Sequence, residues 1–399
     1  MAAPEKEVAK SELPDPKEVA KTYAEVAQRA SKLLSDHIQK QVKKGISAPS
    51  DELGIAQAFM DMMGKLLANP YRLAQAQMNL VWDYFSLWQH SMMRLTGMTP
   101  AAPVASPDKG DKRFKDEEWQ EHFLFDFIKQ SYLITARHIH DTVSTVDGLD
   151  DQSQKKVNFY TRQYIDALSP SNFALTNPEV FRETVKSHGQ NLIKGLNNLL
   201  RDVEEGDGSL RVKMTDTTAF ELGRNVATTP GKVVFQTEMM QLLQYTPSTP
   251  DVSKRPLLIV PPWINKFYIL DLREKNSYIK WCVDQGHTVF VISWVNPDER
   301  LAEKSFDSYL LEGTMAAVDA IVEQTGAKEI NAAGYCLGGT LLATTLAYMA
   351  GKKDKRIASG TFFTTMTDFA DPGELSVFLD EGQITSLEKK MFERGYLEG

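Results

Sequence analysis

The segment at residues 334–339 reads Gly-Tyr-Cys-Leu-Gly-Gly, and its cysteine, Cys336, has the clearest chemistry in the sequence. The apolar run at 329–333 predicts a strand before it, and the Ala- and Leu-rich run at 338–351 predicts a helix after it. A tight strand-to-helix turn holds a nucleophile in strained geometry and needs glycines where side chains would collide. The helix N-terminus favours a thiolate and a tetrahedral oxyanion. We therefore predict that Cys336 is an acyl-accepting nucleophile.

A Gly-x-Cys-x-Gly string alone is a weak signal, because glycines surround small residues by chance. The alternative is a buried structural cysteine, since cysteine often behaves as a small hydrophobe. We favour the nucleophile for Cys336 because of the strand before it and the helix after it. Cys282 lies inside a predicted helix and fits the structural interpretation.

A nucleophile of this kind needs two backbone donors for the oxyanion, the first from the residue after it, here Leu337. The second comes from the loop after the third strand, where Trp263 and Ile264 follow two prolines. Proline has no N–H, so Trp263 or Ile264 is the expected donor. The alternative is a rigid loop that only shapes the pocket.

The chain has two predicted domains, a helical N-terminal domain at 1–205 and an α/β domain at 206–399. Helices are expected at 17–44, 53–68, 71–95, 119–146, 154–168 and 178–203, with a Pro-, Ala- and Ser-rich linker at 97–110. Beyond residue 205, strands are expected at 232–237, 239–245, 257–260, 287–294, 329–333 and 357–364. Helices are expected between them at 273–285, 308–325 and 338–351. Alternating short strands and helices predict a mostly parallel sheet that opens with an antiparallel hairpin, as in the α/β-hydrolase architecture.

The helix at 71–95 is the most aromatic one in the sequence. Leu73, Leu80, Tyr84 and Trp88 recur along one of its faces. Such a stripe usually packs against neighbouring helices. The alternative is that it docks onto a hydrophobic surface or partner.

Composition excludes several classes of function. The net charge of −8 and the lack of basic clusters argue against a nucleic-acid partner. The sequence has no secretory signal, and no apolar run is long enough to predict a transmembrane segment. Two cysteines do not make a disulfide framework and fit a reducing cytoplasm. We expect neither a metal nor a cofactor.

Long stretches of the sequence resemble one family. In the C-terminal half these are PPWINKFYILDL at 261–272, ISWVNPD at 292–298, GYCLGGT at 334–340 and FFTTMTDF at 362–369. In the N-terminal half they are DKRFKDEEW at 111–119, QSYLITARH at 130–138, FYTRQYIDALSPSNFALTNPEV at 159–180 and TDTTAFELGRNVATTPGKVVF at 215–235. On these motifs the chain resembles a class I polyhydroxyalkanoate (poly-3-hydroxybutyrate) synthase.

The resemblance implies an acyltransferase that polymerises (R)-3-hydroxyacyl-CoA into a polyester and releases coenzyme A. The growing acyl chain would be bound to Cys336, which matches the family's nucleophile. The resemblance also implies a homodimer and association with polyester granules in the cytoplasm, through a helical N-terminal domain. The preferred acyl-chain length, the CoA-binding residues and the oligomeric state stay open.

The sequence departs from this pattern after Cys336. In this fold the catalytic acid and histidine follow the nucleophile, yet none of the seven histidines does so here. His287 begins a predicted strand, so we expect it at the sheet edge opposite Cys336. Asp368 follows the last predicted strand and is a weak candidate for the acid. We therefore expect a C-terminally truncated chain, the N-terminal fragment of a longer enzyme that lacks the general-base histidine and is inactive alone.

Two other functions remain as alternatives. A thioesterase or esterase would share the turn at Cys336 but transfer the acyl group to water. A non-catalytic, granule-associated protein would use the helical domain and be indifferent to replacement of Cys336.

Overall fold

The computed structural model describes residue 28 and residues 53–98, 102–206 and 210–397. The helix expected at 17–44 lies outside the described residues apart from residue 28. The chain divides into two compact units. One contains the described residues up to Met214 together with Glu374–Gly382, and the other contains Thr215–Gly373 and Gln383 onward. The domain limits 1–205 and 206–399 stay a prediction.

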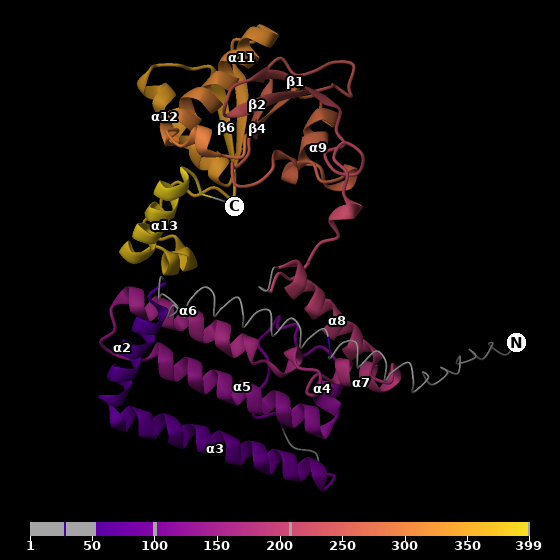
Figure 1. The fold of residues 1–399 in the computed structure, drawn as a ribbon, viewed down its shortest axis with the longest axis vertical. Coiled ribbons are helices and arrows are strands. Elements are labelled where there is room, and N and C mark those ends of the chain that lie inside the picture. The colour runs from indigo at the N-terminus through magenta and orange to yellow at the C-terminus, as the bar shows by residue number, and fades with distance from the viewer. Residues whose placement is uncertain (1–27, 29–52, 99–101, 207–209, 398–399) are drawn as a thin grey trace, which may run out of the picture. The chain divides into compact units, whose positions relative to one another are not determined.

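The first unit is helical, and its long helices α3, α5 and α6 lie side by side (Figure 1). Asn69 caps the start of α3, where its side chain accepts a hydrogen bond from the N–H of Arg72. Pro70 occupies the first turn, where a backbone N–H has no partner within the helix and its absence therefore costs nothing. Asp150 caps α6 in the same way. The helices of this unit are α2 (Ile55–Leu67), α3 (Pro70–Leu95), α4 (Glu118–Glu121), α5 (Phe123–Ser144), α6 (Asp151–Ala167), α7 (Pro178–Lys186) and α8 (Gln190–Glu205).

The single helix expected over 178–203 is wrong, because the chain breaks between α7 and α8. His188 and Gly189 both have left-handed backbone conformations there, with φ of 51° and 83°. Glycine adopts this conformation without strain and commonly ends helices. The apolar periodicity continued across the break and hid it.

The irregular segment after α3 is attached to the helical unit where it is described. The N–H groups of Val104 and Ala105 both donate to Oε1 of Gln130, at 2.7 and 3.2 Å. Ala105 is buried beside Leu87 and Ile134. These contacts hold part of the expected linker against α5.

The second unit contains a six-stranded sheet in the order β1-β2-β4-β3-β5-β6. The first two strands form an antiparallel hairpin, β2 pairs antiparallel with β4, and the remaining pairs are parallel. The sheet therefore confirms the predicted α/β-hydrolase fold class, with its opening hairpin. The strands are β1 (Gly231–Gln236), β2 (Met240–Tyr245), β3 (Leu257–Val260), β4 (Val289–Trp294), β5 (Ile330–Tyr335) and β6 (Ile357–Phe363).

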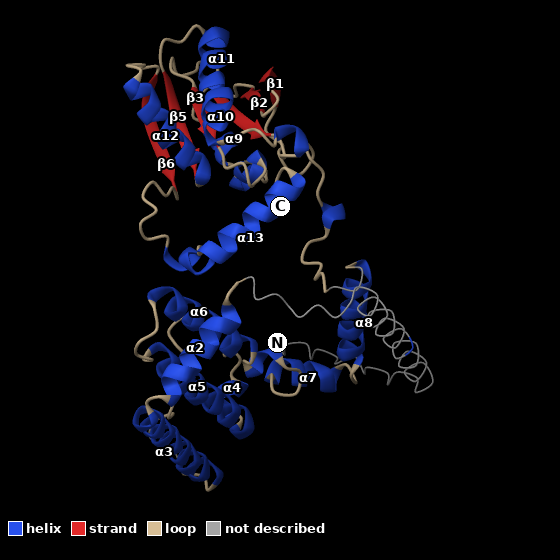
Figure 2. Cartoon of the chain, turned by 60° about the vertical axis from the view of Figure 1, so that its left-hand side comes forward, coloured by secondary structure: helices blue, strands red, loops and turns tan. Residues whose placement is uncertain are grey.

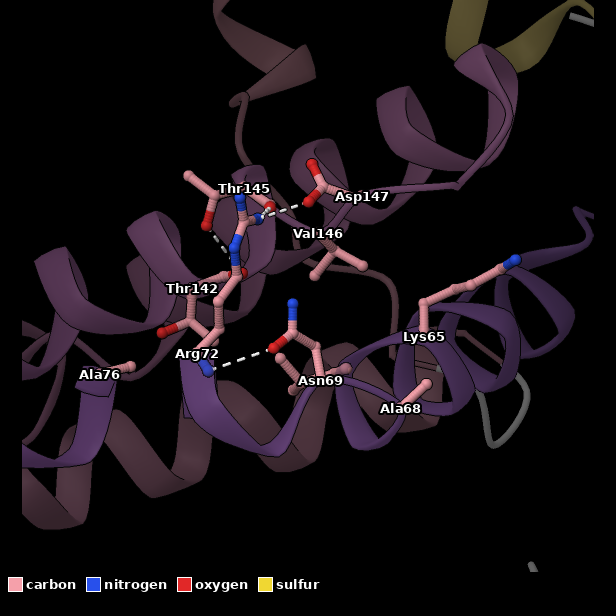
Figure 3. A pocket seen from close by; sticks show the side chains of 10 residues that line it. Lys65, Ala68, Asn69, Arg72, Ala76, Thr142, Thr145, Val146 and Asp147 are labelled. Carbon is pink, nitrogen blue, oxygen red and sulfur yellow. Dashed lines mark hydrogen bonds and ion pairs between the residues drawn. The ribbon is translucent and has the colours of Figure 1, made fainter. Parts of the chain in front are cut away.

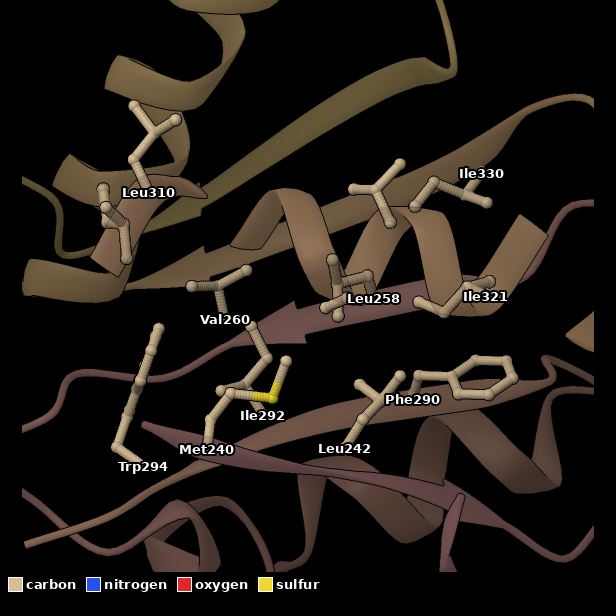
Figure 4. Close-up of a cluster of buried hydrophobic side chains, with 13 residues drawn as sticks. Met240, Leu242, Leu258, Val260, Phe290, Ile292, Trp294, Leu310, Ile321 and Ile330 are labelled. Carbon is tan, nitrogen blue, oxygen red and sulfur yellow. The ribbon is translucent and has the colours of Figure 1, made fainter. Parts of the chain in front are cut away.

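Helices cover both faces of this sheet (Figure 2). On one face Ile279, Cys282 and Val283 of α9 (Tyr278–Asp284) pack on alternate residues of the central strands. On the other face side chains of α11 (Ala316–Thr325) and α12 (Leu337–Gly351) bury the opposite set (Figure 4). Burial on both faces explains why the central strands read as continuous apolar runs. The helix expected over 273–285 begins later, because Ser277 caps α9.

The helix expected over 308–325 is present but starts with a wider turn. After α10 (Phe306–Ser308) the residues Tyr309–Met315 form a π-helix, η6, which continues directly into α11. A Cβ atom on Gly313 of η6 would lie 2.5 Å from the ring of Trp294. Single π-turns of this kind are often found at functional sites.

A short segment after β6 belongs to the helical unit. Its 3₁₀ turn, η7 (Gly373–Phe378), puts Phe378 against Phe159 of α6 at a ring-centroid distance of 5.5 Å. Asp380 forms an ion pair of 2.6 Å with Lys156, which is largely buried. The next helix, α13 (Glu381–Arg394), was not predicted from the sequence.

Candidate active site

Cys336 lies between the end of β5 and the start of α12, in a conformation rare for any residue but glycine. Its φ is 53° and its ψ is −124°. A non-glycine residue there costs about 1–3 kcal/mol and persists only where its surroundings impose it. Its N–H donates to the carbonyl of Phe363 at 3.0 Å, and its own carbonyl accepts from Gly339 and Thr340. Hydrogen bonds to the last residue of β6 and within the first turn of α12 therefore fix the turn.

Three glycines around Cys336 occupy places where no side chain fits. A Cβ atom would lie 2.4 Å from Cα of Gly339 if built on Gly334, and 2.1 Å from the carbonyl oxygen of Val260 if built on Gly338. On Gly339 it would lie 1.9 Å from Oγ1 of Thr365. The glycine spacing in the sequence thus follows from how closely α12 approaches β3 and β5.

The two cysteines differ in burial. Cys336 is half-buried, whereas Cys282 on α9 is 1% exposed. Burial raises the pKa of the Cys282 thiol, which also contacts the hydroxyl of Tyr278. Among the described residues, no hydrogen bond or ion pair involves the thiol of Cys336. The thiol of Cys336 is therefore more accessible than the thiol of Cys282.

The loop after β3 lies beside the turn, because β3 pairs with β5 in parallel and Val260 is opposite Gly334. Within the described part of the chain, the N–H groups of Trp263, Ile264 and Leu337 donate to no other group of the protein. Ile264 is 67% exposed, whereas the ring of Trp263 packs against other aromatic rings. The three expected donors are therefore unused by the fold, as an oxyanion hole requires.

The structure does not join the candidate acid to the nucleophile. Asp368 accepts a hydrogen bond of 2.9 Å from the N–H of Ala370, and no hydrogen bond among the described residues links it to Cys336. Thr340, in the first turn of α12, holds the same loop by donating to the carbonyl of Met366 at 2.7 Å. His287 precedes β4, at the end of the parallel strands opposite Cys336.

Sequence reasoning missed Trp294, the last residue of β4. Its indole Nε1 donates to the carbonyl of Pro261 at 2.8 Å, and the residue is 8% exposed. The only signal in the sequence is a tryptophan that ends a buried strand next to the strand before the oxyanion loop. That position marks it as a neighbour of the site but does not indicate its hydrogen bond.

Cavities elsewhere do not change this picture. The helical unit has a cavity of about 190 Å³ around Asn69 and Arg72, where Arg72 reaches across to Asp147 (Figure 3). All residues that line this cavity belong to the helical unit. In the described ranges, no cluster of three His, Cys, Asp or Glu side chains could hold a metal ion. No helix among those residues is long and apolar enough to cross a membrane.

The sheet order and the strained cysteine between the fifth strand and its helix define an α/β-hydrolase-type protein. Residues 110–282 match the family model of the poly-beta-hydroxybutyrate polymerase (PhaC) N-terminus. The chain is 46% identical to a poly(3-hydroxyalkanoate) polymerase subunit PhaC of Rhizobium etli, over 97% of this chain and 62% of that protein. It is 51% identical to a poly(3-hydroxyalkanoate) polymerase of Methylorubrum extorquens, over 84% of this chain and 55% of that one.

The chain is thus similar to poly(3-hydroxyalkanoate) polymerases over most of its own length. A PhaC subunit of Cupriavidus necator is 38% identical over 82% of this chain and 53% of its own length. The chain thus spans about 53% to 62% of these three relatives. Among solved structures it is similar to a fungal esterase of Rhizomucor miehei, with 15% identity, a TM-score of 0.30, and coverage of 43% of this chain and 56% of that one.

Proposed function

We propose that the protein polymerises (R)-3-hydroxyacyl-CoA into a polyhydroxyalkanoate and releases coenzyme A, through an acyl chain bound to Cys336. The observation that carries this proposal is the backbone of Cys336, strained at the head of α12 between glycines that admit no side chain. The polymerase names of the relatives supply the substrate class.

In the loading step the sulfur of Cys336 attacks the carbonyl carbon of the CoA thioester. The carbonyl oxygen gains a negative charge, which the N–H of Leu337 and that of Trp263 or Ile264 would stabilise. The tetrahedral intermediate then expels the CoA thiolate, which takes up the proton that Cys336 lost. One thioester replaces another, so the acyl group stays activated for the next attack.

In the elongation step the hydroxyl oxygen of an incoming (R)-3-hydroxyacyl-CoA attacks the thioester on Cys336. An oxoester bond forms, the thiol of Cys336 is restored, and the lengthened chain then returns to the cysteine with loss of CoA. This step needs a base for the hydroxyl proton. Water must stay out, because it would end the chain as a free acid.

We propose that this base is not His287, the one described histidine of the α/β unit. It precedes β4, at the end of the parallel strands opposite Cys336. No histidine follows Cys336 in the sequence to take up this proton, and we propose that the chain is inactive alone.

The proposal extends to the partner of the helical unit, which we take to be the polyester granule surface in the cytoplasm. Trp82, Phe85 and Trp88 on α3 form one aromatic group, and their side chains are 63%, 45% and 56% exposed. An exposed apolar patch of this kind marks an interaction site. We also propose that the active form is a homodimer.

Replacing both Trp82 and Trp88 by serine tests this contact. The double variant should lose co-sedimentation with polyester particles, whereas Trp281→Ser, at a tryptophan that is 56% exposed on α9, should not. Equal binding by the wild type, the double variant and Trp281→Ser would contradict a role of α3. Light scattering of the purified protein tests the dimer.

The test of the function uses the full-length gene product with (R)-3-hydroxybutyryl-CoA. We expect CoA release together with insoluble polyester, and neither with Cys336→Ala. Release of CoA with only the free 3-hydroxy acid would indicate a thioesterase. Granule binding without CoA release, unchanged in Cys336→Ala, would indicate a non-catalytic protein.

A further inference from the structure

The carbonyl of Pro261 is held from two sides by parts of the α/β unit that are distant in sequence. Nε1 of Trp294 donates to this carbonyl oxygen at 2.8 Å. On its other side lies Gly338 of the turn, where a Cβ atom would be 2.6 Å from the carbonyl carbon and 2.7 Å from the oxygen of Pro261. This peptide group is thus fixed between the end of β4 and the nucleophile turn.

The same peptide group begins the loop that carries the second oxyanion donor. Pro262 fixes its own φ, so its ψ is the one soft dihedral angle between the carbonyl of Pro261 and the N–H of Trp263, and only Trp263 lies between that group and the N–H of Ile264. A rotation of that peptide plane would therefore move both N–H groups. The hydrogen bond from Trp294 opposes such a rotation.

Trp294 is itself held in place by the π-helix. Its ring lies against Gly313, where a Cβ atom would be 2.5 Å from Cη2. The ring of Tyr309 packs on it at a centroid distance of 5.2 Å, and the ring of Trp263 meets it edge-on at 6.5 Å. Tyr309 also contacts the ring of Trp263, at 5.0 Å. The wide turn of η6 and the aromatic rings therefore fix both the indole and the loop that it holds.

We infer that Trp294 is a positioning residue that sets the second oxyanion donor for acyl transfer to Cys336. The inference rests on the proposed function. It adds that acyl transfer requires the indole N–H of Trp294, which does not touch the reacting atoms. A donor that is displaced rather than removed should weaken the stabilisation of the oxyanion and leave substrate binding nearly unchanged.

The test measures single acylation of Cys336 by an aryl thioacetate, followed by intact-protein mass spectrometry at about pH 9.5, above the ordinary pKa of a free thiol. Trp294→Phe keeps an aromatic ring and removes the donor. Its maximal acylation rate should fall about 10- to 100-fold, with less than about a threefold change in the half-saturating thioester concentration. Trp281→Phe makes the same chemical change at an exposed tryptophan and should match the wild type.

Two further measurements separate positioning from a loss of structure. Alkylation of Cys336 by iodoacetamide forms no oxyanion, so its rate should be the same in Trp294→Phe and the wild type. Gly313→Ala keeps the N–H but pushes a methyl group against the indole, so it should slow acylation in the same direction as Trp294→Phe. Equal acylation rates in Trp294→Phe and Trp281→Phe would overturn the inference, as would a parallel loss of alkylation in Trp294→Phe.

The aryl thioester keeps this test separate from the proposed substrate. If the wild type is acylated by the aryl thioester but releases no CoA from (R)-3-hydroxybutyryl-CoA, the polymerase proposal fails while the role of Trp294 is still measured. If CoA release proceeds and Trp294→Phe equals the wild type, only the inference on Trp294 fails.

Discussion

The two cysteines of the α/β unit have opposite surroundings. Cys336 is half-buried at the strained turn before α12, with the N–H groups of a helix start beside it. Cys282 lies inside α9, is 1% exposed and packs on the sheet with Ile279 and Val283. We therefore expect backbone geometry and burial, not the residue type, to decide which thiol reacts.

The largest expected effect comes from replacing each cysteine by alanine, which removes the thiol. Cys336→Ala should lower CoA release from (R)-3-hydroxybutyryl-CoA by on the order of 10⁶-fold in the full-length protein, because no other group can carry the acyl chain. Cys282→Ala should stay within about twofold of the wild type. A CoA-release assay under identical conditions checks both. Substantial release by Cys336→Ala would remove the distinction between the two cysteines.

The second effect tests the close approach at the turn. Gly338→Ala should lower the free energy of unfolding by about 3 kcal/mol and slow acylation at least about 100-fold, because its methyl group would overlap the backbone of Val260 and Pro261. Gly351→Ala, at the end of the same helix, has open space and should change stability by less than about 1 kcal/mol. Urea unfolding and single-turnover acylation provide the measurements. Similar stability of the two variants would contradict the packing described for the turn.

The third effect is a difference in alkylation rate. Iodoacetamide should modify Cys336 at least about 100-fold faster than Cys282 in the native protein, because the thiolate is the reactive form and access is needed. Burial raises the pKa of Cys282 from its ordinary 9.0, so raising the pH to about 9 should not bring its rate up to that of Cys336. Peptide mapping after timed quenching gives both rates. Comparable rates would mean that α9 opens readily.

The smallest effect is on stability. Cys282→Ala should lower the free energy of unfolding by about 1 kcal/mol at pH 7, since it removes a small buried apolar group. The folded-state pKa of Cys282 is raised, so the contribution of its thiol is complete below the unfolded value of 9.0 and is lost as the pH rises through the folded value. The gap between variant and wild type should therefore shrink above about pH 9. A gap that widens with pH would show that the sign is wrong.

Much of the α/β unit could be predicted from its sequence. Each strand was expected within a few residues, because a sheet covered on both faces requires short apolar runs that punctuating residues separate. The turn at Cys336 was recognisable because the close packing of the turn requires Gly334, Gly338 and Gly339, which stand at a fixed spacing around the cysteine. A feature that leaves a fixed spacing is visible in the sequence.

Features that depend on distant contacts were not predictable. The π-helix at Tyr309–Met315 has an ordinary helical composition, and its wide turn is tied to the ring of Trp294 that lies against Gly313. The hydrogen bond from Trp294 to Pro261 joins residues 33 apart in sequence. The break at His188 was hidden because the apolar period continued through it. For the π-helix and the hydrogen bond from Trp294, tertiary packing rather than local propensity decides the outcome, whereas the break at His188 is a local helix end at a glycine.

The most direct measurement of the central claim is to locate the acyl group. The full-length protein is mixed with (R)-3-hydroxybutyryl-CoA, quenched in acid within the first turnover, digested and mapped by mass spectrometry. We predict a hydroxyacyl thioester on the peptide that contains Cys336 and none on the peptide that contains Cys282. An acyl group on any other residue, or continued CoA release with Cys336 unmodified, would contradict the account.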